Sequence, residues 1–145
     1  MSKGFRAIEW VVLVALGIAL ALWLAARAGK TRLDPEHARQ LTNPVTLNEQ
    51  TLQAARVTYL EKCANCHGET GKGDGPEAMM YNPAPADLSR AHVRHMTDGE
   101  VFYQITEGRK PMPAFKDQLT EEQCWQLVHY VRTFAAQLAP PTTKP

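Results

Sequence analysis

The apolar residues of the chain are concentrated in one run near its start. Residues 7–26 read AIEWVVLVALGIALALWLAA and are apolar except for Glu9. Twenty helical residues at roughly 1.5 Å each span about 30 Å, the thickness of a bilayer's hydrocarbon core. Trp10 and Trp23 lie near the two ends of the run, where amphipathic rings favour the membrane interface. We therefore expect residues 1–28 to form a retained transmembrane anchor.

Two other interpretations of this run remain open. Ala26 and Ala28 place small residues at the two positions that a signal peptidase needs, so that residues 1–28 also fit a signal sequence cleaved after Ala28. The run is longer than the usual apolar core of a signal peptide, about 7–15 residues. A buried helix of a soluble core is the third interpretation, and the uniformly apolar composition of a terminal segment disfavours it.

The remainder of the chain divides into a polar stretch and a region of helical periodicity. Residues 29–48 contain Pro35 and Pro44 and show no sustained periodicity, so we expect a linker there. Residues 49–145 are expected to form an all-α domain, because no stretch alternates as a strand does. Helices are predicted at about residues 47–64, 98–107 and 121–137. Each begins at an S/T-x-x-E/Q capping box, at Thr46/Glu49, Thr97/Glu100 and Thr120/Gln123.

The domain is short of residues that can form a core. Residues 68–95 are rich in Gly, Pro and polar residues and bury little surface by themselves. A large apolar cofactor in the middle of the domain would make up this deficit.

Charge excludes one class of partner. Residues 1–48 carry six Lys and Arg against three acids, and residues 49–145 carry ten against twelve, for a net charge of +1. This balance argues against a nucleic-acid binder that works by bulk positive charge. Three cysteines are too few for a disulfide scaffold.

The run Cys63-Ala64-Asn65-Cys66-His67 is a C-x-x-C-H motif, the attachment signature of a c-type haem. At the end of a helix the two cysteines lie about one turn apart, so both sulfurs can bond to the two vinyl groups of one porphyrin. His67 then supplies an axial ligand to the iron. A redox dithiol would need a βαβ context, and a structural zinc site would need a second pair of ligands.

The other axial ligand is expected to be Met112. It lies in Lys110-Pro111-Met112-Pro113, where two prolines stiffen a loop between two predicted helices. His92 and His95 are the alternatives, whereas Met79, Met80 and Met96 are expected to pack in the core or against the haem. Cys124 lies on the apolar stripe of the last helix and is interpreted as a small buried hydrophobe, with an intermolecular disulfide as the alternative.

The domain resembles the class I monohaem cytochromes c over roughly residues 49–138. The matching segments are 59–68 (YLEKCANCHG), 71–76 (GKGDGP), 83–87 (PAPAD), 108–115 (GRKPMPAF), 119–122 (LTEE) and 130–132 (YVR). The resemblance implies a cytochrome c fold, in which about three main helices and loops surround one covalent haem c. It also implies that the first and last helices cross, and that Pro76 offers its carbonyl to the second ring N–H of His67.

The resemblance implies a single-electron carrier rather than an enzyme. Because c-type haem is attached outside the energy-transducing membrane, the haem domain is expected in the periplasm, tethered to a bacterial inner membrane. Its redox partners would be a quinol-oxidising complex, a terminal oxidase or a photosynthetic reaction centre, and the chain could be a permanent subunit of such a complex. The alternative function is a haem enzyme or gas sensor with a displaceable distal ligand.

This topology predicts the behaviour of a fusion protein. Alkaline phosphatase fused after residue 48 is expected to be active, because the enzyme folds only outside the cytoplasm. An inactive fusion that is still synthesised at full length would reverse the topology.

Overall fold

The computed structural model describes residues 3–28 and 33–136. By their internal contacts, residues 1–32 and residues 33–145 form two separate compact units. Within the described residues the regular elements are helices, and the one β-feature is an isolated bridge between Arg109 and Met112. The predicted all-α class is confirmed for this part of the chain.

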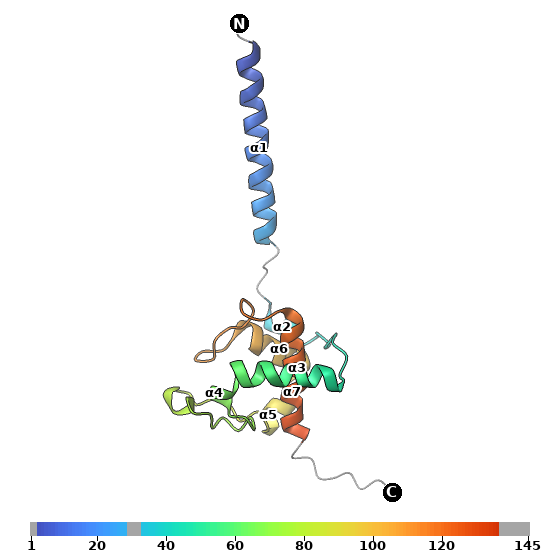
Figure 1. Ribbon diagram of the computed structural model, residues 1–145, viewed down its shortest axis with the longest axis vertical. Helices are drawn as coiled ribbons and strands as arrows, with labels where there is room; N and C mark the ends of the chain where they lie inside the picture. Colours follow the sequence, from blue (N-terminus) through green and yellow to red (C-terminus); the bar gives the residue numbers. More distant parts are fainter. Residues whose placement is uncertain (1–2, 29–32, 137–145) are drawn as a thin grey trace. The chain divides into compact units, whose positions relative to one another are not determined.

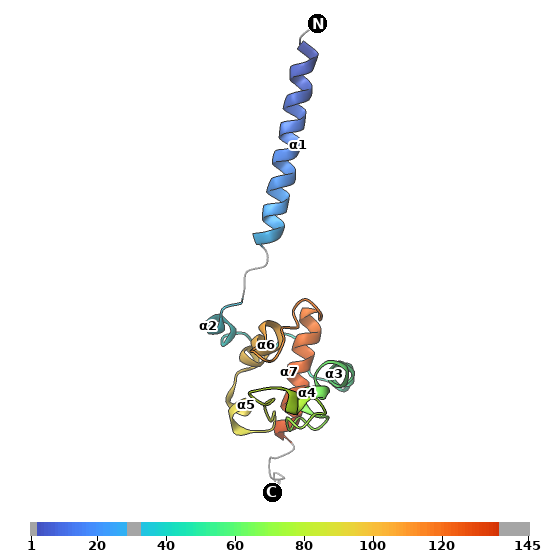
Figure 2. The same ribbon diagram turned by 90° about the vertical axis from the view of Figure 1, so that its left-hand side faces the viewer.

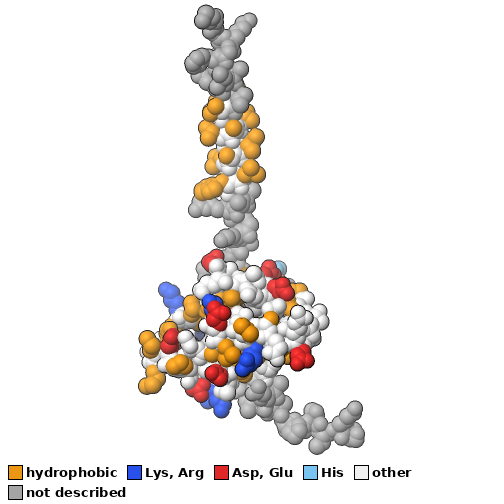
Figure 3. All heavy atoms as spheres, in the orientation of Figure 1, with side chains coloured by type: hydrophobic (Ala, Val, Ile, Leu, Met, Phe, Trp, Pro, Cys, Tyr) orange, Lys and Arg blue, Asp and Glu red, His pale blue; other side chains and the backbone are white. Residues whose placement is uncertain are grey.

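The first unit consists of one helix, α1, which spans Lys3–Ala28 (Figure 1). Its described side chains, at Trp10 and residues 12–23, are exposed and almost entirely apolar (Figure 3). The other side chains of the predicted span, residues 7–26, lie outside the described ones. The expected helix is present, but among the described residues no helix has both the length and the hydropathy needed to cross a membrane.

The second unit contains the remaining helices (Figures 1 and 2). They are α2 (Pro35–Ala38), α3 (Glu49–Lys62), α4 (Ala64–His67), the 3-10 turn η1 (Ala78–Met80), α5 (Ala91–His95), α6 (Asp98–Glu107) and α7 (Glu121–Ala136). The three long helices lie close to the ranges predicted for them. The predicted helix 47–64 differs, because it is divided at Cys63 into α3 and α4.

Two of the three predicted capping boxes are present. Thr97 and Glu100 exchange side-chain and backbone hydrogen bonds at the start of α6. Thr120 and Gln123 do the same before α7. The predicted cap Thr46 is wrong. The Asn48 side chain accepts the Thr51 N–H at 2.8 Å, and α3 begins at the next residue, Glu49. Asn is as good an N-cap as Thr, and here it is the nearer one.

Helices α3 and α7 cross in close contact, as expected (Figure 1). Ala55 of α3 is fully buried, which lets the two backbones approach. Next to it, the ring of Tyr59 lies 5.1 Å from the rings of both Tyr130 and Phe134, measured between centroids. Tilted aromatic pairs at this distance stabilise a contact beyond the area that they bury.

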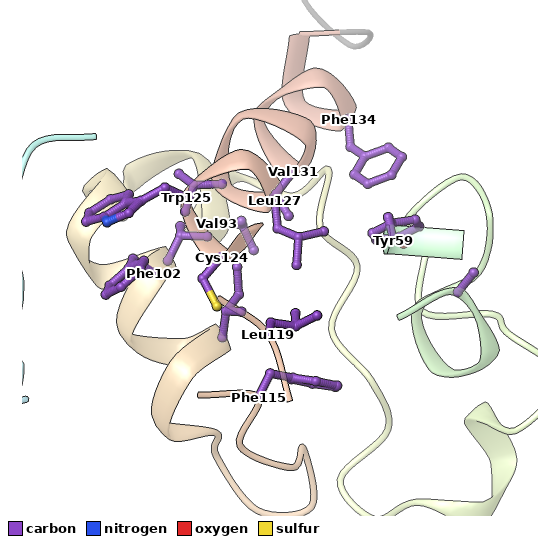
Figure 4. Close-up of a cluster of buried hydrophobic side chains, with 14 residues drawn as sticks. Tyr59, Val93, Phe102, Phe115, Leu119, Cys124, Trp125, Leu127, Val131 and Phe134 are labelled. Carbon is purple, nitrogen blue, oxygen red and sulfur yellow. The ribbon is translucent and has the colours of Figure 1, made fainter. Parts of the chain in front are cut away.

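The core lies between α7, α6 and the segment that joins them (Figure 4). Phe102 of α6 stacks on Trp125 of α7 with centroids 3.9 Å apart. Leu119 and Phe115, which precede α7, close the core from the side of the 108–113 loop. Cys124 is 1% exposed within this cluster, which agrees with its interpretation as a buried hydrophobe.

The segment interpreted as a linker, residues 29–48, contacts the domain at several of its described residues, among them Leu33, Leu41 and Val45. Ala38 of α2 is fully buried, and its carbonyl lies so close to Gly99 of α6 that a Cβ there would collide with it. Farther along, Asn43 donates to the Trp125 carbonyl at 3.0 Å, and His129 donates to the Val45 carbonyl at 2.7 Å. The apolar residues of this segment are too widely spaced to show a period, which explains why the sequence pattern did not reveal their packing.

Arg132 of α7 joins three neighbouring parts of the fold. Its guanidinium donates to the carbonyls of Val93 at 2.9 Å and Met96 at 2.7 Å. It also donates to the carboxylate of Asp98, at the first turn of α6, at 2.9 Å. One planar, permanently charged group therefore holds the corner between α5 and α6 against α7.

Replacing this residue should destabilise the domain. Arg132→Ala is expected to lower the free energy of unfolding by about 2–3 kcal/mol, because two carbonyls and a carboxylate lose a charged donor. Urea unfolding followed by circular dichroism measures the change. The control Arg56→Ala, at an exposed position of α3, should stay within about 0.5 kcal/mol of the unmodified chain. Equal losses for the two variants would contradict a role for the Arg132 network.

Candidate functional site

Cys63, Cys66 and His67 are brought together on a single turn of helix. Cys63 ends α3 and its carbonyl accepts the backbone N–H groups of Cys66 at 3.2 Å and His67 at 2.9 Å. The three side chains therefore project from one short, hydrogen-bonded turn. All three are half-buried, so that each is open to the surface on one side and packed on the other.

Burial affects the acidity of the thiols. It raises the pKa of Cys63 to about 12, with the neighbouring Cys66 and Cys124 adding to the effect. Burial likewise raises the pKa of Cys124 to about 11. Both groups are therefore thiols rather than thiolates at neutral pH.

The imidazole of His67 is oriented by a backbone carbonyl. Its Nδ1 donates to the carbonyl oxygen of Ala86 at 3.0 Å. This corrects the expected acceptor, Pro76, which is exposed in the segment after Gly75. The imidazole pKa is lowered by burial, which the hydrogen bond to Ala86 partly opposes, so the ring is neutral at pH 7. With its Nδ1 carrying the proton, the ring keeps a free lone pair on Nε2 for a metal.

The loop between α4 and α5 folds back to bring Ala86 to this position. Leu88 donates its N–H to the Gly71 carbonyl at 2.6 Å, and Gly73 donates its own to the His67 carbonyl at 2.8 Å. Sequence reasoning missed Ala86, because any residue carries a backbone carbonyl. The available signal was the proline-rich segment 83–85, which stiffens the chain just before it.

Met112 lies on a closed turn between α6 and α7. Its N–H donates to the Arg109 carbonyl at 2.8 Å, and its carbonyl accepts the Arg109 N–H at 3.1 Å. Beyond the turn, Phe115 donates to the Ile105 carbonyl at 3.1 Å and so fastens the loop to α6. The Met112 side chain is half-buried and packs against the core cluster.

The other predicted ligand candidates are placed differently. His92 and His95 are exposed on α5, and Met96 is partly buried against the core, as expected. Met79 and Met80 are 100% and 77% exposed on η1, so they do not pack in the core, and the alternative, packing against the haem, stays a prediction. An open groove of about 530 Å³ lies between residues 44–48 and the start of α7, and none of the predicted site residues lines it.

The residues present fit a covalent haem. Two thiols one helical turn apart match the two vinyl groups of one porphyrin, and the adjacent imidazole has its Nδ1 already engaged, which leaves Nε2 for the iron. A thioether on a stiff loop adds a soft donor of the kind that iron accepts in electron carriers.

Comparisons with known proteins agree with this chemistry. The family model described as cytochrome c oxidase, cbb3-type, subunit III, matches residues 50–131. The cbb3-type cytochrome c oxidase subunit FixP of Sinorhizobium medicae is 32% identical over 127 residues, which cover 80% of this chain and 42% of FixP. Cytochrome c6 of Thermosynechococcus vestitus is 28% identical over 94 residues, which cover 65% of this chain and 79% of the cytochrome.

A solved structure shows the same fold. A chain of the Kuenenia stuttgartiensis reducing HAO-like protein complex Kustc0457/Kustc0458 superposes with a TM-score of 0.56 and 29% identity. The match covers 70% of this chain and 49% of that one. The present chain therefore spans less than half of both FixP and the Kuenenia chain. Since the family model covers more than half of its residues, the chain belongs to the family of the cbb3-type cytochrome c oxidase subunit III, as a class I c-type cytochrome with one covalent haem c.

Proposed function

We propose that the chain is a one-electron carrier in which Cys63 and Cys66 bind the haem covalently and His67 and Met112 are the axial ligands. The observation that carries the proposal is the hydrogen bond from His67 Nδ1 to the Ala86 carbonyl. It holds the ring in one tautomer beside the two thiols and makes Nε2 a stronger donor to iron. The bound haem supplies a reversible change between ferrous and ferric iron.

Met112 is proposed as the second ligand because its loop restrains it. The two backbone hydrogen bonds between Arg109 and Met112 close the turn, and Pro111 and Pro113 fix the chain on both sides. A thioether is a weak ligand, so a loop that already holds it in place reduces the entropy lost on binding. Methionine opposite histidine also gives a higher reduction potential than two histidines do.

We further propose that the domain works in the periplasm, tethered to a bacterial inner membrane by residues 7–26. The sequence of that segment, apolar except for Glu9, supports the tether. The similarity to FixP, named as a subunit of a cbb3-type oxidase, supports a terminal oxidase as the electron acceptor or as the complex to which the chain belongs. A quinol-oxidising complex would then be the donor, and a photosynthetic reaction centre is the alternative acceptor.

A haem enzyme or gas sensor is the second candidate function. The structural similarity to a chain of a reducing HAO-like complex favours it, because that complex carries a name taken from an enzyme. The two functions differ at the distal side of the haem. An electron carrier keeps both axial ligands, whereas an enzyme or sensor must release one.

Covalent attachment can be tested by removing the two cysteines of the motif. In the variant Cys63→Ala/Cys66→Ala, the mass of the denatured chain is expected to fall by one haem, since no sulfur is left to bond the vinyl groups. The control Cys124→Ala removes a buried thiol outside the motif and should keep the haem. Covalent haem in the double variant, seen by mass spectrometry, would contradict the proposed attachment.

The distal ligand can be tested with Met112→Ala. We expect the oxidised variant to lose the far-red absorption band of methionine-sulfur ligation and its reduction potential to fall, because thioether favours ferrous iron. The variant should also bind carbon monoxide when reduced, while the unmodified chain should not at neutral pH. The fully exposed Met79→Ala is the control and should leave all three properties unchanged.

These measurements separate the two candidate functions. Persistence of the far-red band in Met112→Ala would contradict the assignment of Met112. Rapid carbon monoxide binding by the unmodified reduced chain would instead favour the enzyme or sensor.

A further inference from the structure

The loop after α4 is bound to His67 at two points, Gly73 and Ala86. On one side, the Gly73 N–H donates to the His67 backbone carbonyl at 2.8 Å. On the other side, the imidazole of His67 donates to the Ala86 carbonyl at 3.0 Å. The backbone of His67 therefore binds the first segment of this loop, at Gly73, and its side chain binds the second segment, at Ala86.

The α-carbon of Gly73 lies close to the backbone of the second segment, at Pro85 and Ala86. A Cβ built on Gly73 would collide with the carbonyl oxygen of Pro85 and would lie 3.2 Å from the carbonyl carbon of Ala86. That carbon bears the oxygen that accepts the His67 hydrogen bond. The backbone of Gly73 also has a φ of +77°, a conformation that residues with a side chain rarely adopt.

We propose that Gly73 is the positioning residue of the imidazole hydrogen bond, because its bare α-carbon lets the backbone of Pro85 and Ala86 lie close enough for the Ala86 carbonyl to accept from His67 Nδ1. This proposal rests on the proposed function, in which His67 is an axial ligand. The role is one of placement, since Gly73 has no side chain to touch the haem or the iron.

A methyl group at this position has a defined consequence. It displaces the backbone of Pro85 and Ala86 away from Gly73, and Gly73 is itself bound to the backbone of His67. The Ala86 carbonyl therefore also moves away from the imidazole, and its hydrogen bond from His67 lengthens. A weaker hydrogen bond makes the imidazole a poorer donor to iron, which destabilises the ferric state more than the ferrous state.

The test compares Gly73→Ala with the control Gly99→Ala in the full-length haem-loaded chain. A Cβ on Gly99 would also collide with a backbone carbonyl oxygen, that of Ala38 in α2. Gly99 lies on α6, outside the loop that carries Ala86. Only Gly73→Ala presses on the backbone of Pro85 and Ala86, whose Ala86 carbonyl accepts the His67 hydrogen bond.

Two quantities report on the hydrogen bond itself. In Gly73→Ala we expect the reduction potential to rise and the Nδ1 proton of His67, observed by NMR in the ferrous protein, to exchange faster with solvent. In Gly99→Ala both quantities should match those of the unmodified chain, although both variants lose stability. Unchanged values in Gly73→Ala, or equal changes in the two variants, would overturn the proposal.

A second variant decides the question if Gly73→Ala yields no haem-loaded protein. Pro85→Gly loosens the backbone just before the Ala86 carbonyl without adding an atom. The Nδ1 proton should therefore again exchange faster, and an unchanged exchange rate would overturn the proposal. The proposed function is judged separately, on the covalent haem and far-red band of the unmodified chain. Their presence together with an unmoved potential in Gly73→Ala would contradict only the role of Gly73.

Discussion

The hydrogen bond from the Tyr59 hydroxyl to the Gly68 carbonyl, at 2.7 Å, connects the core of the domain to its haem-binding turn. The Tyr59 ring is 1% exposed at the crossing of α3 and α7, between Tyr130 and Phe134. Burial raises the pKa of its hydroxyl, which therefore remains a donor. Since losing either partner would leave a buried polar group unsatisfied, the residue after His67 is fixed by the packing of two helices distant in sequence.

Helix α7 is the element to which three irregular parts of the domain attach. The segment before α3 is bound to it through Asn43 and His129, and the corner between α5 and α6 through Arg132. The loop that carries Ala86 is fastened at Gly71, whose α-carbon faces the ring of Phe134. A domain with much irregular chain can be ordered in this way, because several of its segments pack on the same helix.

The helices and the haem-binding motif could be predicted from the sequence because both depend on local spacing. The capping boxes at Thr97 and Thr120 and the C-x-x-C-H run involve residues at most four positions apart. Asn48 could have been recognised from the same kind of signal, since it directly precedes α3. The acceptor for the imidazole, Ala86 rather than Pro76, could not, because it is a backbone atom 19 residues away that only the folded loop brings near.

The turn between Arg109 and Met112 bears on how fast an electron could be exchanged. Two backbone hydrogen bonds close the turn, and a third, from Phe115 to Ile105, fastens it to α6. If Met112 is the ligand, its sulfur can move little when the charge on the metal changes. The environment would then need little reorganisation between the two oxidation states, and a small reorganisation energy lowers the barrier to electron transfer. The stiffness of this loop would thus contribute to the speed of the carrier as well as to its potential.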